Sequence, residues 1–204
     1  MPHADSSFVP DTIQTKTEFY DHVLTQLEAL LEGERYWVTN LAQTAAILYH
    51  SYLGSALYGG DAHGPVVNWC GFYLHPPSHP SSSSSGSGST HPLLLGPYQG
   101  RPACLSILLQ PNTKSGNVGV CATSFLSRKT VIVPDVENHP GHIACDGETK
   151  SEIVVPLVSS DPDSYSKVVG VLDLDSTVLN TFDEDDQKGL ESVVKLIQDA
   201  CDWS

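Results

Sequence analysis

The segment from Pro76 to Pro92 constrains the fold of this chain most, because it divides the sequence without leaving a foldable unit in front of it. It reads PPSHPSSSSSGSGSTHP, a composition typical of flexible coil in which the prolines prevent regular strand pairing. The residues before it have the patterns of only two helices and one strand, which make a poor core. We therefore predict one domain over residues 15–204, with a disordered Ser/Gly/Pro-rich loop at residues 76–92 and a flexible N-terminus at residues 1–14.

Length and charge exclude several classes of protein. A chain of 204 residues can bury one core, and ten basic residues against 24 acidic ones give a formal net charge of -14. Such a surface repels phosphate backbones and anionic membranes, so we expect no nucleic acid and no membrane as partners. No apolar run is long enough to span a bilayer, and residues 1–19 have neither a secretory nor a transit pattern, which predicts a cytoplasmic protein.

Hydrophobic periodicity predicts four helices. A capping-box pattern at Thr15–Glu18 precedes an apolar stripe at helical spacing from Phe19 to Leu31, and Gly33 ends this helix. The other helices are expected at about 38–57, from about Gly119, and at about 183–202. Strand-like runs occupy residues 66–74, 93–95, 105–109, 130–133, 152–159 and 168–175. This order is typical of an α+β domain with a central, mostly antiparallel sheet flanked by helices.

Two aromatic residues on one expected strand are candidate ligand contacts. Strand alternation places Trp69 and Tyr73 on one face with Gly71 between them. Because glycine has no side chain, the two rings flank a slot that can hold a small ligand. The alternative is core packing around a glycine bulge, and the strand pattern taken alone favours that alternative.

Three carboxyl groups form a second candidate feature. One face of the last strand carries Val169 and Val171 and then two acids, Asp173 and Asp175, and Glu152 begins the neighbouring strand run. If these strands pair, the three acids converge and raise one another's proton affinity, which favours a protonated carboxyl that can act as a general acid. The alternative is a solvent-facing strand end on which the aspartates are simply hydrated.

The five cysteines are an odd number at wide spacing, which does not indicate a disulfide framework. Cys145 lies in an expected loop beside the turn-forming pair Asp146-Gly147, and loops carry function more often than cores do. Cys121 lies at an expected helix start, where the helix dipole favours a thiolate. Cys70 and Cys201 have the patterns of buried structural residues, and no local feature distinguishes Cys104.

Six segments taken together match the pattern of one known family. They are NWCGFY at 68–73, LGPYQG at 95–100 with Ala103-Cys104, GVC at 119–121, VPDV at 133–136 running on to HPGHIACD at 139–146, SEIVVP at 151–156, and GVLDLD at 170–175. This set resembles the GAF-domain free methionine-R-sulfoxide reductases, and the resemblance covers about residue 36 to the C-terminus. It implies a single GAF domain with a central antiparallel sheet.

The resemblance also implies roles for individual residues. Cys145 matches the catalytic cysteine, Cys104 the resolving cysteine, and Cys121 a third family cysteine that assists. The side chains that match substrate-binding positions are Trp69 and Tyr73 at the methyl end of the substrate, and Glu152, Asp173 and Asp175. The chain departs from the family in an insertion around residues 111–117, between Cys104 and Cys121, and in Ala122, where glycine is usual. Which of the two cysteines resolves is therefore left open.

The function implied is thiol-dependent reduction of free L-methionine-(R)-sulfoxide, a repair of oxidative damage with thioredoxin as reductant and no metal or organic cofactor. Homodimerisation is a further expectation from the family. Two alternatives belong to other classes: a GAF domain that binds a small ligand as a sensor without turnover, and a zinc-stabilised interaction module. The zinc module would use His139, His142 and Cys145, which lack the second ligand pair usual for zinc.

Overall fold

The computed structural model describes residues 9–59, 66–75, 91–111, 118–140, 146–158 and 168–203. Most of the predicted loop at residues 76–92 lies outside these ranges, as do residues 1–8 of the predicted flexible N-terminus. In chain order the elements are α1 (Lys16–Leu31), α2 (Trp37–Gly54), the 3-10 helix η1 (Ala56–Tyr58), β1 (Val67–Leu74), β2 (Leu93–Gly100), β3 (Ser106–Ile107), α3 (Val120–Ser127), β4 (Val131–Val133), β5 (Ser151–Val158), β6 (Val168–Ser176) and α4 (Glu184–Ala200).

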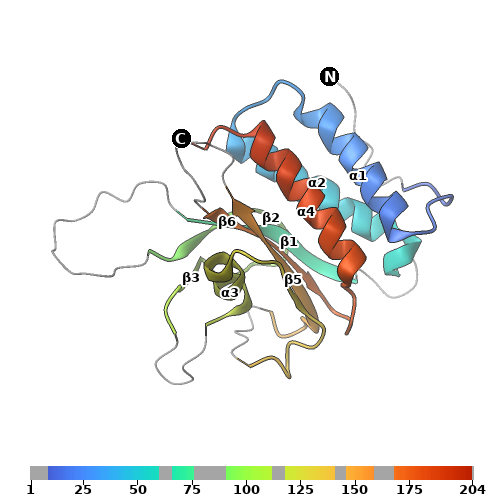
Figure 1. The fold of residues 1–204 in the computed structure, drawn as a ribbon. Helices are drawn as coiled ribbons and strands as arrows, with labels where there is room; N and C mark the ends of the chain where they lie inside the picture. The colour runs from blue at the N-terminus through green and yellow to red at the C-terminus, as the bar shows by residue number, and fades with distance from the viewer. Residues whose placement is uncertain are drawn as a thin grey trace.

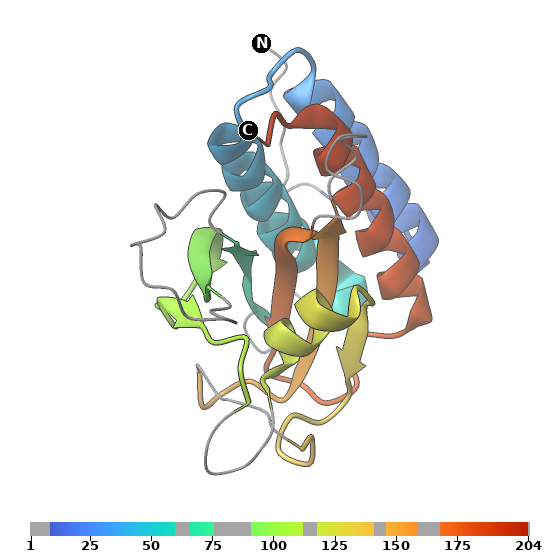
Figure 2. The same cartoon turned by 60° about the vertical axis from the view of Figure 1, so that its left-hand side comes forward.

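The strands form one antiparallel sheet in the order β3-β2-β1-β6-β5-β4. Helices α2 and α4 pack on one face, α1 runs alongside them on the side away from the sheet, and α3 lies on the opposite face (Figures 1 and 2). Because alternate strand residues point to opposite faces, the sheet separates two hydrophobic clusters, one under the three long helices and one beside α3. The predicted α+β class with a mostly antiparallel sheet is confirmed.

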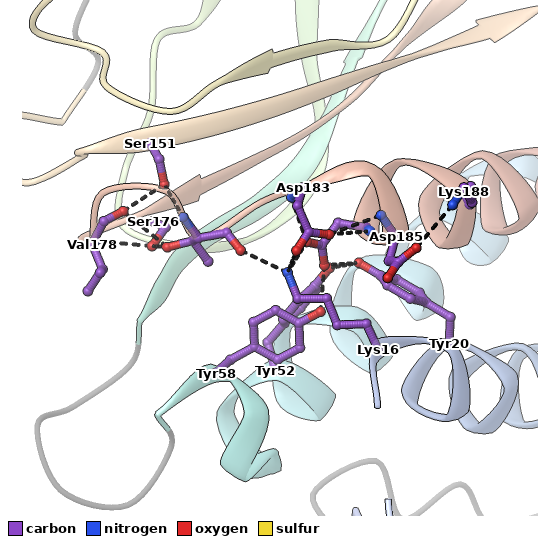
Figure 3. A network of polar contacts seen from close by, with 12 residues as sticks. Lys16, Tyr20, Tyr52, Tyr58, Ser151, Ser176, Val178, Asp183, Asp185 and Lys188 are labelled. Atoms are coloured by element: carbon purple, nitrogen blue, oxygen red, sulfur yellow. Dashed lines mark hydrogen bonds and ion pairs between the residues drawn. The ribbon is translucent and has the colours of Figure 1, made fainter. Parts of the chain in front are cut away.

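The first turn of α4 contains a buried carboxylate, which contacts residues from the N-terminal part of the chain. Asp186 is fully buried, and its Oδ1 accepts hydrogen bonds from the Tyr20 hydroxyl at 2.9 Å and the Tyr58 hydroxyl at 2.5 Å. Its Oδ2 pairs with the Lys16 ammonium and also accepts from the backbone N–H of Asp183, the N-cap of α4 (Figure 3). A buried carboxylate with this many donors is stabilised in place, so α1, η1 and α4 are held together.

Most helix predictions are confirmed, with shifts at the ends. The capping box of Thr15 and Glu18 starts α1 as predicted. The second helix was predicted to reach about residue 57, but α2 ends at Gly54 and Ser55 caps the separate turn η1 through its hydroxyl. No helix in the described part of the chain is long and apolar enough to cross a membrane.

Two strand predictions differ from the structure because of bulges. Strand β2 runs on from Leu95 to Gly100, and its register against β1 shifts across Gly96-Pro97, so the proline lies at an irregularity where its missing N–H costs little. Val169 was predicted to share a face with Val171, but it packs in the helix-side cluster. The register between β5 and β6 shifts beside it, which turns its side chain to the other face.

Candidate functional site

Strand register brings the three predicted carboxyl groups and one predicted aromatic residue together. Asp175 of β6 lies opposite Trp69 of β1 and opposite Glu152 of β5, so these residues form one row across three strands. In the next row Asp173 lies opposite Gly71 and Val154. Directly opposed residues in a sheet have their side chains on the same face. The sequence hypothesis that the acids converge is therefore confirmed.

A pocket opens on this face, between the sheet and the start of α3. It is lined by all five residues that the sequence predicted as substrate contacts and by one predicted cysteine; the full lining is Trp69, Tyr73, Ala103, Ile107, Gly119, Val120, Cys121, Thr149, Glu152, Asp173 and Asp175. One wall is aromatic and apolar, and the floor is acidic. Such an amphipathic pocket suits a small ligand with an apolar end and a cationic or hydrogen-bonding end.

The aromatic wall is a stack of three rings rather than the predicted slot. The Trp69 ring lies nearly parallel to Tyr73, with centroids 5.8 Å apart, and to Tyr98, at 5.5 Å. The space above Gly71 is filled, since a methyl group there would overlap the Tyr98 side chain and lie 2.7 Å from Trp69 Cη2. The open slot between Trp69 and Tyr73 was therefore a wrong prediction, because these two rings stack on each other and the space above Gly71 is filled by the edge of the Trp69 ring and the Cβ of Tyr98.

Sequence reasoning assigned no role to Tyr98. The signal was the glycine itself, because a glycine in a strand core often accommodates a large side chain from the neighbouring strand, but the pairing of Gly71 with Tyr98 follows only from the register. Thr149 was missed for a similar reason. It lies just before β5 in a segment without a pattern, and only the fold brings it to the pocket.

The carboxyl groups are buried next to one another, which changes their protonation. Glu152 and Asp173 are 5% and 6% exposed, and one oxygen of Asp173 accepts a hydrogen bond from the Cys121 thiol at 3.2 Å. Burial raises the pKa of Asp173 to about 7, although hydrogen bonds from Cys121 and Glu152 oppose this rise. Burial, and then the charge of Asp173, raise the pKa values of Glu152 and Asp175 well above the usual range. The pocket therefore holds carboxyl groups that keep protons near neutral pH.

Three buried polar atoms of the pocket have no hydrogen-bond partner among the described residues. They are the second oxygen of Asp173, the indole Nε1 of Trp69 and the hydroxyl oxygen of Thr149. Buried polar groups are nearly always satisfied in folded proteins, so an acceptor and a donor without partners in one pocket indicate where a polar ligand would bind.

Cys121 lies where it was predicted, in the first turn of α3, but its thiol is not activated. Burial, and then the charges of Asp173 and Glu152, raise the pKa of Cys121 well above the usual range. The expected thiolate at this helix start was wrong, because desolvation and nearby carboxyl groups outweigh the dipole of a short helix. Cys121 is a free thiol, as are the buried Cys70 and Cys201.

Cys104 lies at the rim of the pocket, between the lining residues Ala103 and Ile107, and it is disulfide-bonded. Its carbonyl oxygen accepts a hydrogen bond from the Tyr73 hydroxyl at 3.0 Å, which ties this segment to the aromatic wall. Cys145, the predicted nucleophile, and His142 lie outside the described residues.

A cation is one possible occupant of the acidic floor. The ligand atoms of Cys121, Glu152 and Asp173 lie within 4.8 Å of one another, a spacing that one ion could bridge. A metal would have to displace the proton of a thiol whose pKa is raised, whereas an ammonium group would need only the carboxylates.

The fold and the pocket together define the class of this protein. An antiparallel sheet with long helices on one face and a small-ligand pocket under a short helix on the other is the architecture of a GAF domain. The family model described as the GAF domain matches residues 82–202.

Comparison with known proteins narrows the class to a family. The free methionine-R-sulfoxide reductase of Saccharomyces cerevisiae is 38% identical over 91% of this chain and 87% of its own length. The Escherichia coli protein of the same name is 34% identical over 90% and 88%. An X-ray structure of the Neisseria meningitidis reductase in complex with its substrate has a TM-score of 0.70 at 34% identity, covering 95% of each chain. The chain belongs to the GAF-domain free methionine-R-sulfoxide reductase family and is an oxidoreductase.

Proposed function

We propose that this protein reduces free L-methionine-(R)-sulfoxide to methionine, with Cys145 as nucleophile and Cys104 as resolving cysteine. The observation that carries the proposal is the pocket in which Trp69 and Tyr73 face a cluster of protonated carboxyl groups, with the disulfide-bonded Cys104 at its rim. A sulfoxide reductase needs a proton donor for the departing oxygen and a thiol pair that can be reduced again. A receptor pocket needs neither.

The reaction proceeds in three balanced steps. The Cys145 thiolate attacks the sulfoxide sulfur and an S–S bond forms, while the sulfoxide oxygen takes up a proton. The S–O bond then breaks and the hydroxyl group bonds to the Cys145 sulfur as the S–S bond breaks, so methionine leaves with the electron pair and Cys145 becomes a sulfenic acid. The Cys104 thiol then attacks the sulfenic sulfur, which forms the disulfide and releases water. A dithiol reductant finally returns both cysteines to thiols. The disulfide bond at Cys104 supports its role as the resolving residue, and Cys121, a free thiol, is left as an assisting residue.

The acids divide the work by protonation state. Glu152, whose pKa burial raises, holds the proton that the sulfoxide oxygen needs as it leaves. Asp173, whose pKa of about 7 lets it ionise most readily, pairs with the α-ammonium of the free amino acid through its unpartnered oxygen, and Asp175, protonated like Glu152, contacts the substrate as a hydrogen-bond donor. A peptide-bound methionine sulfoxide has no such ammonium, so it would leave these carboxyl groups unpaired and bind poorly.

The aromatic wall recognises the other end of the substrate. Trp69 and Tyr73 contact the methyl and sulfur atoms, where sulfur–aromatic contacts are favourable. The ring stack with Tyr98 fixes the orientation of the indole, so the wall needs little rearrangement on binding. Thioredoxin is the proposed reductant, and homodimerisation stays a prediction.

The decisive test is reduction of the separated R and S forms of free methionine sulfoxide, driven either by dithiothreitol or by thioredoxin. We expect turnover of the R form alone, no turnover by Cys145→Ser, and little activity on a peptide-bound sulfoxide. Cys70→Ser, at a buried cysteine on the other face of the sheet, is the control for loss of a thiol. Equal rates for Cys145→Ser and the parent would remove Cys145 from the reaction, and binding without turnover would identify a sensor.

A further inference from the structure

The disulfide-bonded Cys104 lies on a sheet edge that no other described strand covers. Strand β3 begins two residues after Cys104 and is the last strand on that side of the sheet, so its outer backbone groups have no strand partner in the described part of the chain. On its inner side the segment is fixed, because Leu93 and Leu94 pair with β3 and the Leu95 N–H donates to the Leu105 carbonyl at 3.0 Å. The inner side of this edge is therefore held by β2, and its outer side has no strand partner among the described residues.

This edge carries the two most exposed large apolar side chains in the described part of the chain. Leu105, which precedes β3 in the sequence, is 81% exposed, and Leu108, which follows it, is 69% exposed. Of the two residues between them, Ile107 lines the pocket, whereas Ser106 is exposed. Exposed leucines lower the solubility of a protein and add nothing to its core. Two of them beside the Cys104 disulfide therefore indicate a surface that another protein covers.

We propose that β3, with Leu105 and Leu108, is the docking surface for the dithiol protein that reduces the Cys104 disulfide. This inference rests on the proposed function, and it assigns the reductant's place of binding and its point of attack. A protein reductant has to bring a thiolate into line with a sulfur of the disulfide. Cys104 is partly exposed and adjoins the edge strand, so a partner that pairs its backbone with β3 and packs on the leucines brings its thiolate to the Cys104 sulfur.

The exchange balances without any further reactant. A thiolate of the partner attacks Cys104, an intermolecular disulfide forms, and the cysteine released from Cys104 leaves as a thiolate that takes up a proton. The second thiol of the partner then attacks its own sulfur in the mixed disulfide and releases Cys104 as a thiol. Two electrons and two protons pass from the partner to this chain, and the partner leaves as a disulfide.

The test compares Leu105→Gln and Leu108→Gln with Leu126→Gln, a control at an exposed leucine of α3. With thioredoxin as reductant we expect kcat/KM for thioredoxin to fall about tenfold in each of the first two variants, the loss typical of one interface anchor. Dithiothreitol is too small to need a docking surface, so the dithiothreitol-driven rate should stay at the parent value in all three. An equal fall with both reductants, or no fall with thioredoxin, overturns the proposal.

A second measurement locates the point of attack. Thioredoxin whose second active-site cysteine is replaced by serine stops at the mixed disulfide, and peptide mass spectrometry should find it on Cys104. A mixed disulfide on another cysteine overturns the assignment of Cys104. Failure of the parent with dithiothreitol would instead refute the proposed reductase function, so the two failures are distinguishable.

Discussion

The Asp173 carboxyl group combines features that serve binding at the expense of stability. It is buried, it accepts a hydrogen bond from Cys121, and its second oxygen has no partner among the described residues. Ionisation of such a group is costly in the empty pocket, which is why burial raises its pKa from the ordinary value of 3.8 to about 7. A cationic ligand would remove that cost.

We predict that Asp173→Asn stabilises the ligand-free protein while lowering its activity. The folded protein favours protonated Asp173, because the pKa of this group is higher in the folded than in the unfolded chain. The stability that the protonated group contributes is therefore fully present below pH 3.8 and is lost as the pH rises toward about 7. The variant lacks this loss, so its thermal midpoint should exceed that of the parent by about 5 °C at pH 8 and by little at pH 4. Thermal denaturation at both pH values checks this, with Asp21→Asn on the exposed face of α1 as control. A gain independent of pH would contradict the argument.

Single residues of the site were predictable where a strand pattern places them. Trp69, Tyr73, Glu152, Asp173 and Asp175 all line the pocket, because alternation along a strand determines the face of each side chain. The protonation state of Cys121 was not predictable, because its thiol on α3 responds to burial and to carboxyl groups on the strands β5 and β6. Those terms depend on distances that a sequence does not contain.

Helix α4 packs so closely on α1 that one of its positions tolerates no side chain. Gly189 is buried at the crossing with Tyr20, and a methyl group there would overlap the tyrosine ring. The same tyrosine donates to the buried Asp186 at the start of α4, so it cannot move aside without losing that hydrogen bond. Close approach of the two helices therefore depends on this glycine.

We predict that Gly189→Ala destabilises the protein by about 1–3 kcal/mol, the usual cost of overpacking a core, although alanine is the better helix former. Gly147→Ala is the matched control, because a methyl group at Gly147 has no neighbour within 4 Å. In urea denaturation, the urea concentration at the unfolding midpoint should be lower than the parent value for Gly189→Ala and unchanged for Gly147→Ala. Since Gly189 lies on the far side of the sheet from the pocket, the KM for substrate should not change.

Elements with a strong repeating pattern were predicted well, and irregular ones were not. Helices α1 and α4 begin within a residue or two of the predicted positions, because both have capping residues. Strand β2 was predicted too short, since Gly96 and Pro97 disfavour a strand and only a bulge against β1 accommodates them. Strand β3 was predicted too long, because Leu105 and Leu108 have apolar side chains that the structure exposes.

At the scale of the whole molecule, the first helix and the last hold the fold together although neither reaches the pocket. The core beneath the three long helices includes Phe19, Tyr20, Val23, Leu27 and Leu31 of α1. The matched family model begins at residue 82, after α1, α2 and β1. Helix α1, which precedes this matched segment, packs apolar side chains against α4 and provides the Lys16 ammonium that pairs with Asp186.

We predict that a chain without residues 1–31 does not fold, although every pocket residue lies beyond residue 66. Loss of α1 exposes buried apolar surface of α2 and α4 and leaves Asp186 without the Tyr20 and Lys16 donors. Circular dichroism and calorimetry should show no cooperative transition, whereas a chain without residues 1–8 should unfold like the parent. A cooperative transition in the shorter chain would show that the sheet is stable without α1.

The row of residues across β1, β6 and β5 has a consequence for how such a protein diversifies. Trp69, Asp175 and Glu152 project from strands whose main chains are already hydrogen-bonded to neighbours, so the pairing does not rely on what these side chains are. Single-nucleotide changes at the acidic codons can therefore give an amide in place of a carboxylate without disturbing the backbone beneath. The same frame could thus be inherited by lineages that recognise quite different metabolites.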